Sequence, residues 1–167
     1  MNLIFRKANS DELPKVLNLY QTTAQWFLSQ NINQWTQWLV PTDDLVFWLK
    51  EGIKNEEFWF AEDENIETKG MFRLLYEDED YWGKQDIEAG YVHSLITLRE
   101  FSGEKIGEKM LQFVENELIR KNIFLFRLDC VASNEKLCNY YISKGFTPLF
   151  DKQMKYTINR FFEKKLK

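Results

Sequence analysis

The sequence has little of what disulfide-rich, metal-binding or fibrous proteins need: two cysteines, one histidine, three prolines and seven glycines among 167 residues. The cysteines lack metal-ligand spacing, and such a pair is expected as free thiols in a reducing compartment. No apolar run approaches the ~20 residues that a membrane span requires. The first seven residues lack the basic-then-apolar order of a secretory signal peptide. We therefore expect a cytoplasmic protein with no membrane segment and no metal.

Hydrophobic residues make up 44% of the chain and aromatic residues 16%, which is typical of a folded globular protein. No linker-like segment interrupts the chain, so we expect a single domain over residues 1–167. The net charge of −4 is unevenly spread: residues 1–90 carry a net −9 and all six tryptophans, whereas residues 91–167 carry a net +5. The acidic balance argues against nucleic acid as a partner.

Apolar periodicity predicts a chain in which strands alternate with helices. The predicted strands cover residues 3–7, 57–61, 70–76, 90–98, 124–131, 146–150 and 155–163. The predicted helices cover residues 11–28, 43–54, 106–118 and 135–144, with Asn9 or Ser10 and Ser133 or Asn134 as caps. Residues 77–80 are predicted as an acidic loop. The strand–helix–strand–helix order of residues 90–145 indicates a mixed α/β sheet.

One turn is a candidate phosphate site. A predicted strand ending at residues 95–98 leads into a turn containing Gly103, and a helix containing Gly107 follows. Such a turn can direct several backbone N–H groups at one anion, and the positive end of the helix dipole adds to the attraction. The spacing is neither that of a Walker A loop nor that of the Rossmann fingerprint. The alternative is an ordinary β–α turn that contains two glycines.

A second segment places Asn134 and Tyr141 seven residues apart, which puts both on one face of the predicted helix. The Gly145-Phe146 pair follows the helix. An amide and a hydroxyl in this arrangement can point into one cleft. The alternative is that Tyr141 is an amphipathic tyrosine at the edge of the core.

Together the two segments resemble the GNAT superfamily of N-acetyltransferases, which transfer acetyl from acetyl-CoA to an amine. The turn resembles that family's pyrophosphate-binding motif, and the second segment resembles its Asn–Tyr–Gly-Phe helix. The resemblance extends to a bacterial subgroup through five further segments: Trp26-Phe27-Leu28, Gln34-Trp35, Tyr81-Trp82-Gly83, residues 89–95 and Arg127-Leu128-Asp129-Cys130. It implies a GNAT-like fold, with a twisted mixed sheet of six or seven strands flanked by about four helices.

The resemblance implies acetyl-CoA as cofactor. The residues that it assigns to the cofactor are Leu95, Ile96, Thr97, Ser102, Gly103, Glu104, Lys105, Ile106, Gly107 and Asn134. Two of them depart from the family pattern Arg/Gln-x-x-Gly-x-Gly/Ala, because Ser102 replaces the Arg or Gln and Lys105 replaces the middle glycine. Lys105 supplies positive charge, but its Cβ narrows the backbone conformations available, so acetyl-CoA binding is expected to be weaker rather than lost.

The reaction that the resemblance implies is direct attack of a neutral amine on the thioester in a ternary complex. By the same resemblance, Tyr141 donates a proton to the leaving thiolate, and a backbone N–H at Leu95–Thr97, with Ile96 as first choice, stabilises the developing oxyanion. His93 is the only histidine and a candidate general base; the alternative is a core-edge histidine bonded to its neighbours. Glu88 is a second candidate, and its alternative is an exposed carboxylate. Cys130 shows no pairing with a histidine and is interpreted as a small buried hydrophobe.

The resemblance implies that the acceptor site is formed largely by the acidic, tryptophan-rich segments, which makes Trp26, Trp35 and Trp82 candidate substrate-binding residues. Carboxylates attract amines and tryptophan faces can hold cations, so we expect a small cationic amine or a peptide amine as the acceptor. Core packing is the alternative for the tryptophans. The enzyme is expected as a monomer or homodimer. The rival functions are a non-catalytic acetyl-CoA-binding module and an interaction protein that uses exposed tryptophan.

Overall fold

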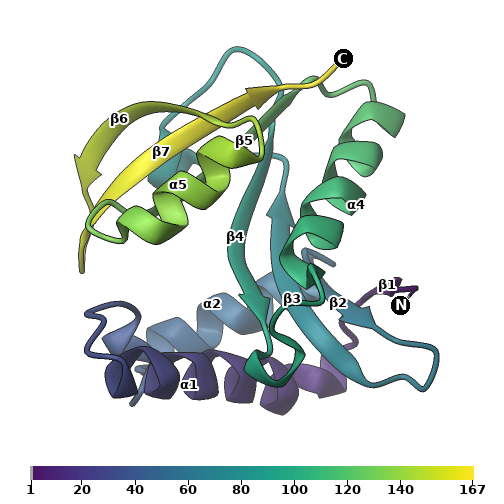
Figure 1. Cartoon of the computed structure of the whole chain (residues 1–167), viewed down its shortest axis with the longest axis vertical. Helices are drawn as coiled ribbons and strands as arrows, with labels where there is room; N and C mark the ends of the chain where they lie inside the picture. Colours follow the sequence, from purple (N-terminus) through teal and green to yellow (C-terminus); the bar gives the residue numbers. More distant parts are fainter. Residues whose placement is uncertain (1) are drawn as a thin grey trace. The chain divides into compact units, whose positions relative to one another are not determined.

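A computed structural model describes residues 2–167, which contain seven β-strands and five α-helices (Figure 1). The strands are β1 (Ile4–Lys7), β2 (Phe58–Glu62), β3 (Thr68–Leu75), β4 (Gly90–Thr97), β5 (Leu125–Val131), β6 (Thr147–Gln153) and β7 (Ile158–Lys165). The helices are α1 (Leu13–Ser29), α2 (Asp43–Lys54), α3 (Glu79–Trp82), α4 (Ile106–Arg120) and α5 (Glu135–Ser143). Short 3-10 turns lie at Ser10–Glu12, Thr36–Trp38 and Arg99–Phe101.

The strands form one mixed sheet in the order β1-β2-β3-β4-β5-β7-β6. β4 and β5 run parallel, whereas β2 is antiparallel to β1 and β3, and β7 is antiparallel to β5 and β6. The predicted mixed α/β class and seven strands are confirmed. The structure has one helix beyond the four located in the sequence: α3 covers residues 79–82, and its first two residues belong to the stretch 77–80 that was expected as an acidic loop.

The chain folds as two compact units that are interleaved in the sequence: residues 2–73 with 94–107, and residues 74–93 with 108–167. In the first unit α1 and α2 lie side by side (Figure 1). One apolar cluster joins these helices to the strands, with Val16, Tyr20, Leu49 and Phe58 at its centre. The expectation of one domain over residues 1–167 stays a prediction.

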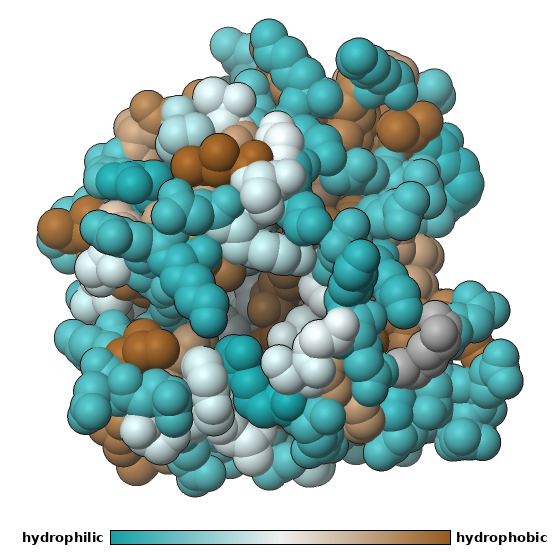
Figure 2. Space-filling view, viewed as in Figure 1, coloured by the Kyte–Doolittle hydropathy of each residue, from teal (hydrophilic) through white to brown (hydrophobic). Residues whose placement is uncertain are grey.

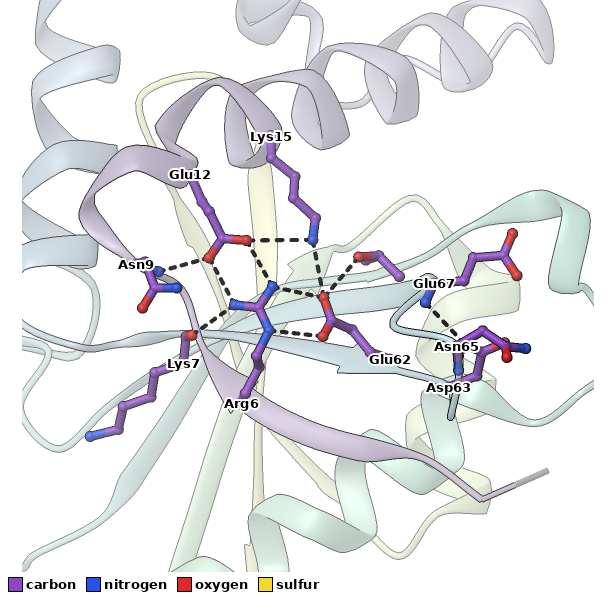
Figure 3. Close-up of polar contacts among 10 residues, drawn as sticks. Arg6, Lys7, Asn9, Glu12, Lys15, Glu62, Asp63, Asn65 and Glu67 are labelled. Atoms are coloured by element: carbon purple, nitrogen blue, oxygen red, sulfur yellow. Dashed lines mark hydrogen bonds and ion pairs between the residues drawn. The ribbon is translucent and has the colours of Figure 1, made fainter.

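Arg6 on β1 ties the start of the first unit together (Figure 3). Its guanidinium donates two hydrogen bonds of 2.8 Å to Glu62 on β2 and bonds of 2.8 and 2.7 Å to Glu12. Lys15 on α1 adds an ion pair of 3.1 Å to Glu62. Because the Glu62 side chain is 4% exposed, these cations compensate a carboxylate that is removed from water.

The Arg6–Glu12 pair predicts acid sensitivity. Hydrogen bonding to Arg6 lowers the pKa of Glu12 from 4.5 to about 2. A carboxyl whose pKa is lower in the folded protein stabilises the fold above its unfolded pKa and loses that contribution as the pH falls toward the folded value. Glu12→Gln is expected to lower the free energy of unfolding at pH 7 by about 1 kcal/mol, with a smaller difference from wild type at pH 3. Urea unfolding at both pH values measures this, and an equal difference at both contradicts it.

The second unit contains α3, β5, β6, β7, α5 and most of α4. Arg127 on β5 is a buried cation at the centre of a hydrogen-bond cluster in this unit. It donates to Glu163 at 2.9 Å, to Gln85 at 2.9 Å and to the Tyr91 hydroxyl at 3.1 Å. Its guanidinium also lies 4.8 Å from the centre of the Trp82 ring. These contacts fasten the segment around α3 to β5 and β7.

Hydrophilic residues dominate the face in Figure 2, and apolar residues appear there as separate spots. Exposed apolar side chains are scattered along the chain and include Phe47 on α2 and, in loops, Val40, Ile66 and Ile87. Among the described residues, none of the helices combines the length and apolar character that crossing a bilayer demands.

Candidate functional site

β4 is distorted in its middle. Its register pairs Gly90–Val92 with Phe126–Leu128 of β5, and two residues later Ser94 has a φ of +56°, in the left-handed region. The Tyr20 hydroxyl of α1 hydrogen-bonds the Ser94 hydroxyl. The expectation that His93 shares a face with Leu95 assumes regular alternation along the strand, and the left-handed Ser94 between them breaks that alternation.

The residues after this break form the predicted cofactor turn, which lies in the first unit. Leu95 and Thr97 are half-buried, whereas the Ile96 side chain is buried in the core cluster. Residues 102–105 are exposed, and a Cβ added at Gly103 (φ +92°) would meet nothing within 4 Å. Buried Ile106 begins α4, and Gly107 follows inside it. An open turn before a 15-residue helix, whose first amides lack intrahelical acceptors, fits a pyrophosphate.

Lys105 occupies the left-handed conformation itself, with a φ of +58°. A non-glycine residue in this region costs about 1–2 kcal/mol, and glycine adopts it freely. Lys105→Gly is therefore expected to raise the free energy of unfolding by up to about 1 kcal/mol, whereas Lys105→Ala, which keeps the Cβ, gives no gain. Urea unfolding of the two variants tests this, and equal stability of both contradicts it.

Asn134 and Tyr141 lie in the second unit, at the start and near the end of α5. The Asn134 side chain accepts a hydrogen bond of 3.2 Å from the Leu137 N–H, so Asn134, one of the two predicted caps, caps the helix. Tyr141 is 5% exposed and packs against the rings of Phe146 and Phe162. Burial raises the pKa of Tyr141 well above 10, and the charges of Cys130 and Tyr140 act in the same direction. Tyr141 therefore holds its proton at neutral pH.

His93 lies between two buried carboxylates of the same unit. Its Nε2 is 2.8 Å from Asp78 Oδ2, and its Nδ1 is 3.7 Å from Asp129 Oδ1. The two aspartate side chains are each 5% exposed and that of His93 is 10% exposed. The Tyr81 ring packs against the imidazole, with 4.6 Å between ring centres. Both ring nitrogens of His93 thus face carboxylates.

Asp78 was missed because an acidic run is usually a solvated loop. In the fold Asp78 directly precedes α3, and its carbonyl accepts the Trp82 N–H at 2.9 Å. The local signal was the aromatic pair Tyr81-Trp82, which lies three and four residues after Asp78, the spacing of neighbours on one helical turn.

Asp129 on β5 was also missed as a site residue. Asn159 of β7 donates a hydrogen bond of 2.6 Å to its Oδ2, and Thr157 in turn donates one of 2.6 Å to the Asn159 Oδ1. Asp129 Oδ1 is buried without a hydrogen-bond partner. Burial raises the pKa of Asp129, against the opposing effects of His93 and Asn159.

The other candidates are placed differently. Glu88 is exposed and lies two residues before β4. Cys130 and Cys138 are buried free thiols with 3.6 Å between their Sγ atoms, and burial raises the pKa of Cys130. This environment agrees with the interpretation of Cys130 as a small hydrophobe, because a nucleophilic cysteine needs a stabilised thiolate. Within residues 2–167 no cluster of three or more His, Cys, Asp and Glu side chains is arranged to hold a metal.

The three candidate acceptor tryptophans have packing partners. Trp26 is half-buried, with the Arg99 guanidinium 3.6 Å from its ring centre. Trp35 packs against the core cluster of the first unit, 5.3 Å from the Tyr20 ring. Trp82 lies in the core of the second unit, 5.0 Å from the Phe161 ring. Their assignment to an acceptor stays a prediction.

Comparison with known proteins identifies the family of this chain. Residues 54–148 match the model of the family described as the acetyltransferase (GNAT) domain. The uncharacterized N-acetyltransferase YesJ of Bacillus subtilis (strain 168) is 28% identical over 141 residues, which cover 81% of this chain and 77% of YesJ.

Two solved structures illustrate the likeness in fold. A GNAT-family acetyltransferase from Listeria monocytogenes 4b F2365 is 26% identical, with a TM-score of 0.80 over 98% of this chain and 95% of that one. The PaiA N-acetyltransferase from Thermoplasma acidophilum, solved in complex with coenzyme A, is 18% identical, with a TM-score of 0.63 over 99% of both chains.

Proposed function

Because the chain belongs to the GNAT acetyltransferase family, we propose that it transfers acetyl from acetyl-CoA to a primary amine, by direct attack of the amine within a ternary complex. The chain is an acetyl-CoA-dependent acyltransferase by its family. Acetyl-CoA supplies the activated acetyl thioester. What the proposal adds is the class of acceptor and the route of transfer.

The observation that favours a catalyst over a binding module is Tyr141. Only a catalyst needs a proton donor for the leaving thiolate, and a tyrosine hydroxyl can be that donor. In Tyr141 burial disfavours the phenolate and holds the proton in place. In the proposed reaction the Tyr141 hydroxyl donates that proton to the departing thiolate, and the Ile96 N–H stabilises the negative charge that develops on the acetyl oxygen.

A cationic acceptor is supported by charge. Residues 1–90 carry a net −9, and Asp78 and Asp129 together present two buried carboxylates for one histidine. An ammonium is attracted to such surroundings, and so we infer a small cationic amine or a peptide amine as the acceptor. Charge attraction is screened by salt, so the KM for the acceptor should rise as ionic strength increases.

Two measurements test the proposal. Thermal unfolding with saturating acetyl-CoA should raise Tm, since a ligand that binds only the folded state stabilises it. A panel of polyamines, aminoglycoside-like amines and peptide N-termini, followed by release of the CoA thiol, should then identify turnover with a cationic amine. A rise in Tm without turnover of any amine favours the binding module, and no rise in Tm contradicts both functions.

A further inference from the structure

The proposed reaction needs a group that takes the proton lost by the attacking amine. His93 is poorly placed for this task by itself, because Nε2 is hydrogen-bonded to Asp78 and Nδ1 faces Asp129. A general base needs a lone pair within hydrogen-bond reach of the proton that it removes. The imidazole of His93 instead holds the carboxylates of Asp78 and Asp129 in place.

Asp129 Oδ1 has what a base needs. It is the buried side-chain oxygen or nitrogen within residues 2–167 that lacks a hydrogen-bond partner. The other oxygen, Oδ2, is held by Asn159, which fixes the orientation of the carboxylate. A buried acceptor left unsatisfied costs about 1–3 kcal/mol, more for a charged group, and a catalytic role is one of the explanations for such a group.

The position of Asp129 on β5 supports the same role. The parallel pairing of β5 with β4 ends at Leu128, so Asp129 is the first residue beyond the paired segment. On its other side β5 remains paired with β7, where Asp129 is opposite Phe161. The titratable groups coupled electrostatically to Asp129 are His93 from β4, Asp78 before α3, Tyr141 from α5 and its own neighbour Cys130.

Resting on the proposed function, we propose that Asp129 is the general base of the acetyl transfer and that its Oδ1 receives the proton of the attacking amine. As the carbon–nitrogen bond forms, the proton passes from nitrogen to Asp129. As the carbon–sulfur bond breaks, the Tyr141 hydroxyl gives its proton to the sulfur. The proton on Asp129 then returns to the Tyr141 phenolate, so a neutral amine and acetyl-CoA yield the amide and CoA thiol, with both residues restored.

The chemistry of each group suits this cycle. Burial raises the pKa of Asp129, which makes its carboxylate a better proton acceptor than an exposed one. Burial also makes a Tyr141 phenolate costly, so prompt return of a proton matters. His93 and Asn159 both stabilise the ionised form of Asp129 and are therefore positioning residues.

The test is Asp129→Asn, which keeps the shape of the side chain and an oxygen for Asn159. With the best amine of the panel, kcat is expected to fall about 10²–10⁴-fold, with the dissociation constant for acetyl-CoA and the Tm little changed. In the wild type, log(kcat/KM) should fall more steeply below the pH at which Asp129 gains a proton, and the variant should lack this break. Asp129→Glu should restore part of the rate and the break.

Two further variants keep the idea testable should Asp129→Asn fold poorly. Asn159→Ala removes a hydrogen bond that favours the carboxylate and should move the break to higher pH. His93→Gln should do the same and retain more than a tenth of the wild-type rate above the break. Asp86→Asn, at an exposed carboxylate of the same unit, is the matched control and should stay within twofold of wild type.

The outcomes separate this role from the proposed function. Wild-type turnover with an unchanged Asp129→Asn rate, or a break that Asn159→Ala leaves in place, overturns the role of Asp129 alone. If His93→Gln is inactive at every pH while Asp129→Asn keeps the wild-type rate, the general base is His93, and this result also overturns the role of Asp129. Absence of wild-type turnover with any amine contradicts the proposed function and this role together.

Discussion

Tyr141→Phe is expected to lower kcat for acetyl transfer by about 10²–10⁴-fold, because it removes the proton donor to the leaving thiolate and nothing else. The phenyl ring retains the packing of Tyr141 against Phe146 and Phe162, so Tm should change little. The dissociation constant for acetyl-CoA should remain within about twofold, since general acid catalysis acts in the transition state rather than on the bound ground state. Thiol release under saturating acetyl-CoA measures the loss.

Tyr140→Phe is the matched control for this experiment. Tyr140 precedes Tyr141 on α5, is half-buried, and loses the same hydroxyl in its own variant. Its rate should stay within about twofold of wild type, because no proton transfer is assigned to it. Equal turnover by Tyr141→Phe and wild type would remove Tyr141 from the role of acid.

The largest expected effect on stability follows from Arg127. Arg127→Met removes one member of a buried ion pair and leaves Glu163, Gln85 and the Tyr91 hydroxyl without their donor. Removal of one partner from a buried pair typically costs about 3–5 kcal/mol, and methionine restores the volume but not the charge. Urea unfolding should therefore show a loss of about 3 kcal/mol in the free energy of unfolding.

Two further variants serve as comparisons for the loss of stability in Arg127→Met. Arg127→Met combined with Glu163→Gln removes both charges and should recover part of the stability, because the orphaned carboxylate is the main cost. Arg120→Met breaks the exposed pair with Glu117, in which the Arg120 side chain is 67% exposed, and should lower the free energy of unfolding far less than Arg127→Met, because solvent screens an exposed pair. A loss in Arg127→Met no greater than in Arg120→Met would show that the buried cluster contributes little.

Local signals predicted most of the secondary structure. The sequence pattern placed α1, α2 and α4 and all seven strands within a few residues of their bounds, because most of these elements bury at least one face of a regular repeat; β6, whose residues are all exposed, is the exception. Asn134 was identified as a cap because its side-chain oxygen needs only an N–H three residues away. α3 was missed, since four residues are too few to show a helical period.

The candidate site also contains parts that the sequence predicted and parts that it did not. The sequence by itself determined the turn around Gly103 and Lys105 and the spacing of Asn134 and Tyr141, because residues close in the chain have few relative positions open to them. Only the tertiary structure decided that Asp78 meets His93 across 15 residues and that Asn159 meets Asp129 across 30. It also decided the burial that raises the pKa values of Asp129 and Tyr141, because desolvation depends on every element packed around a group.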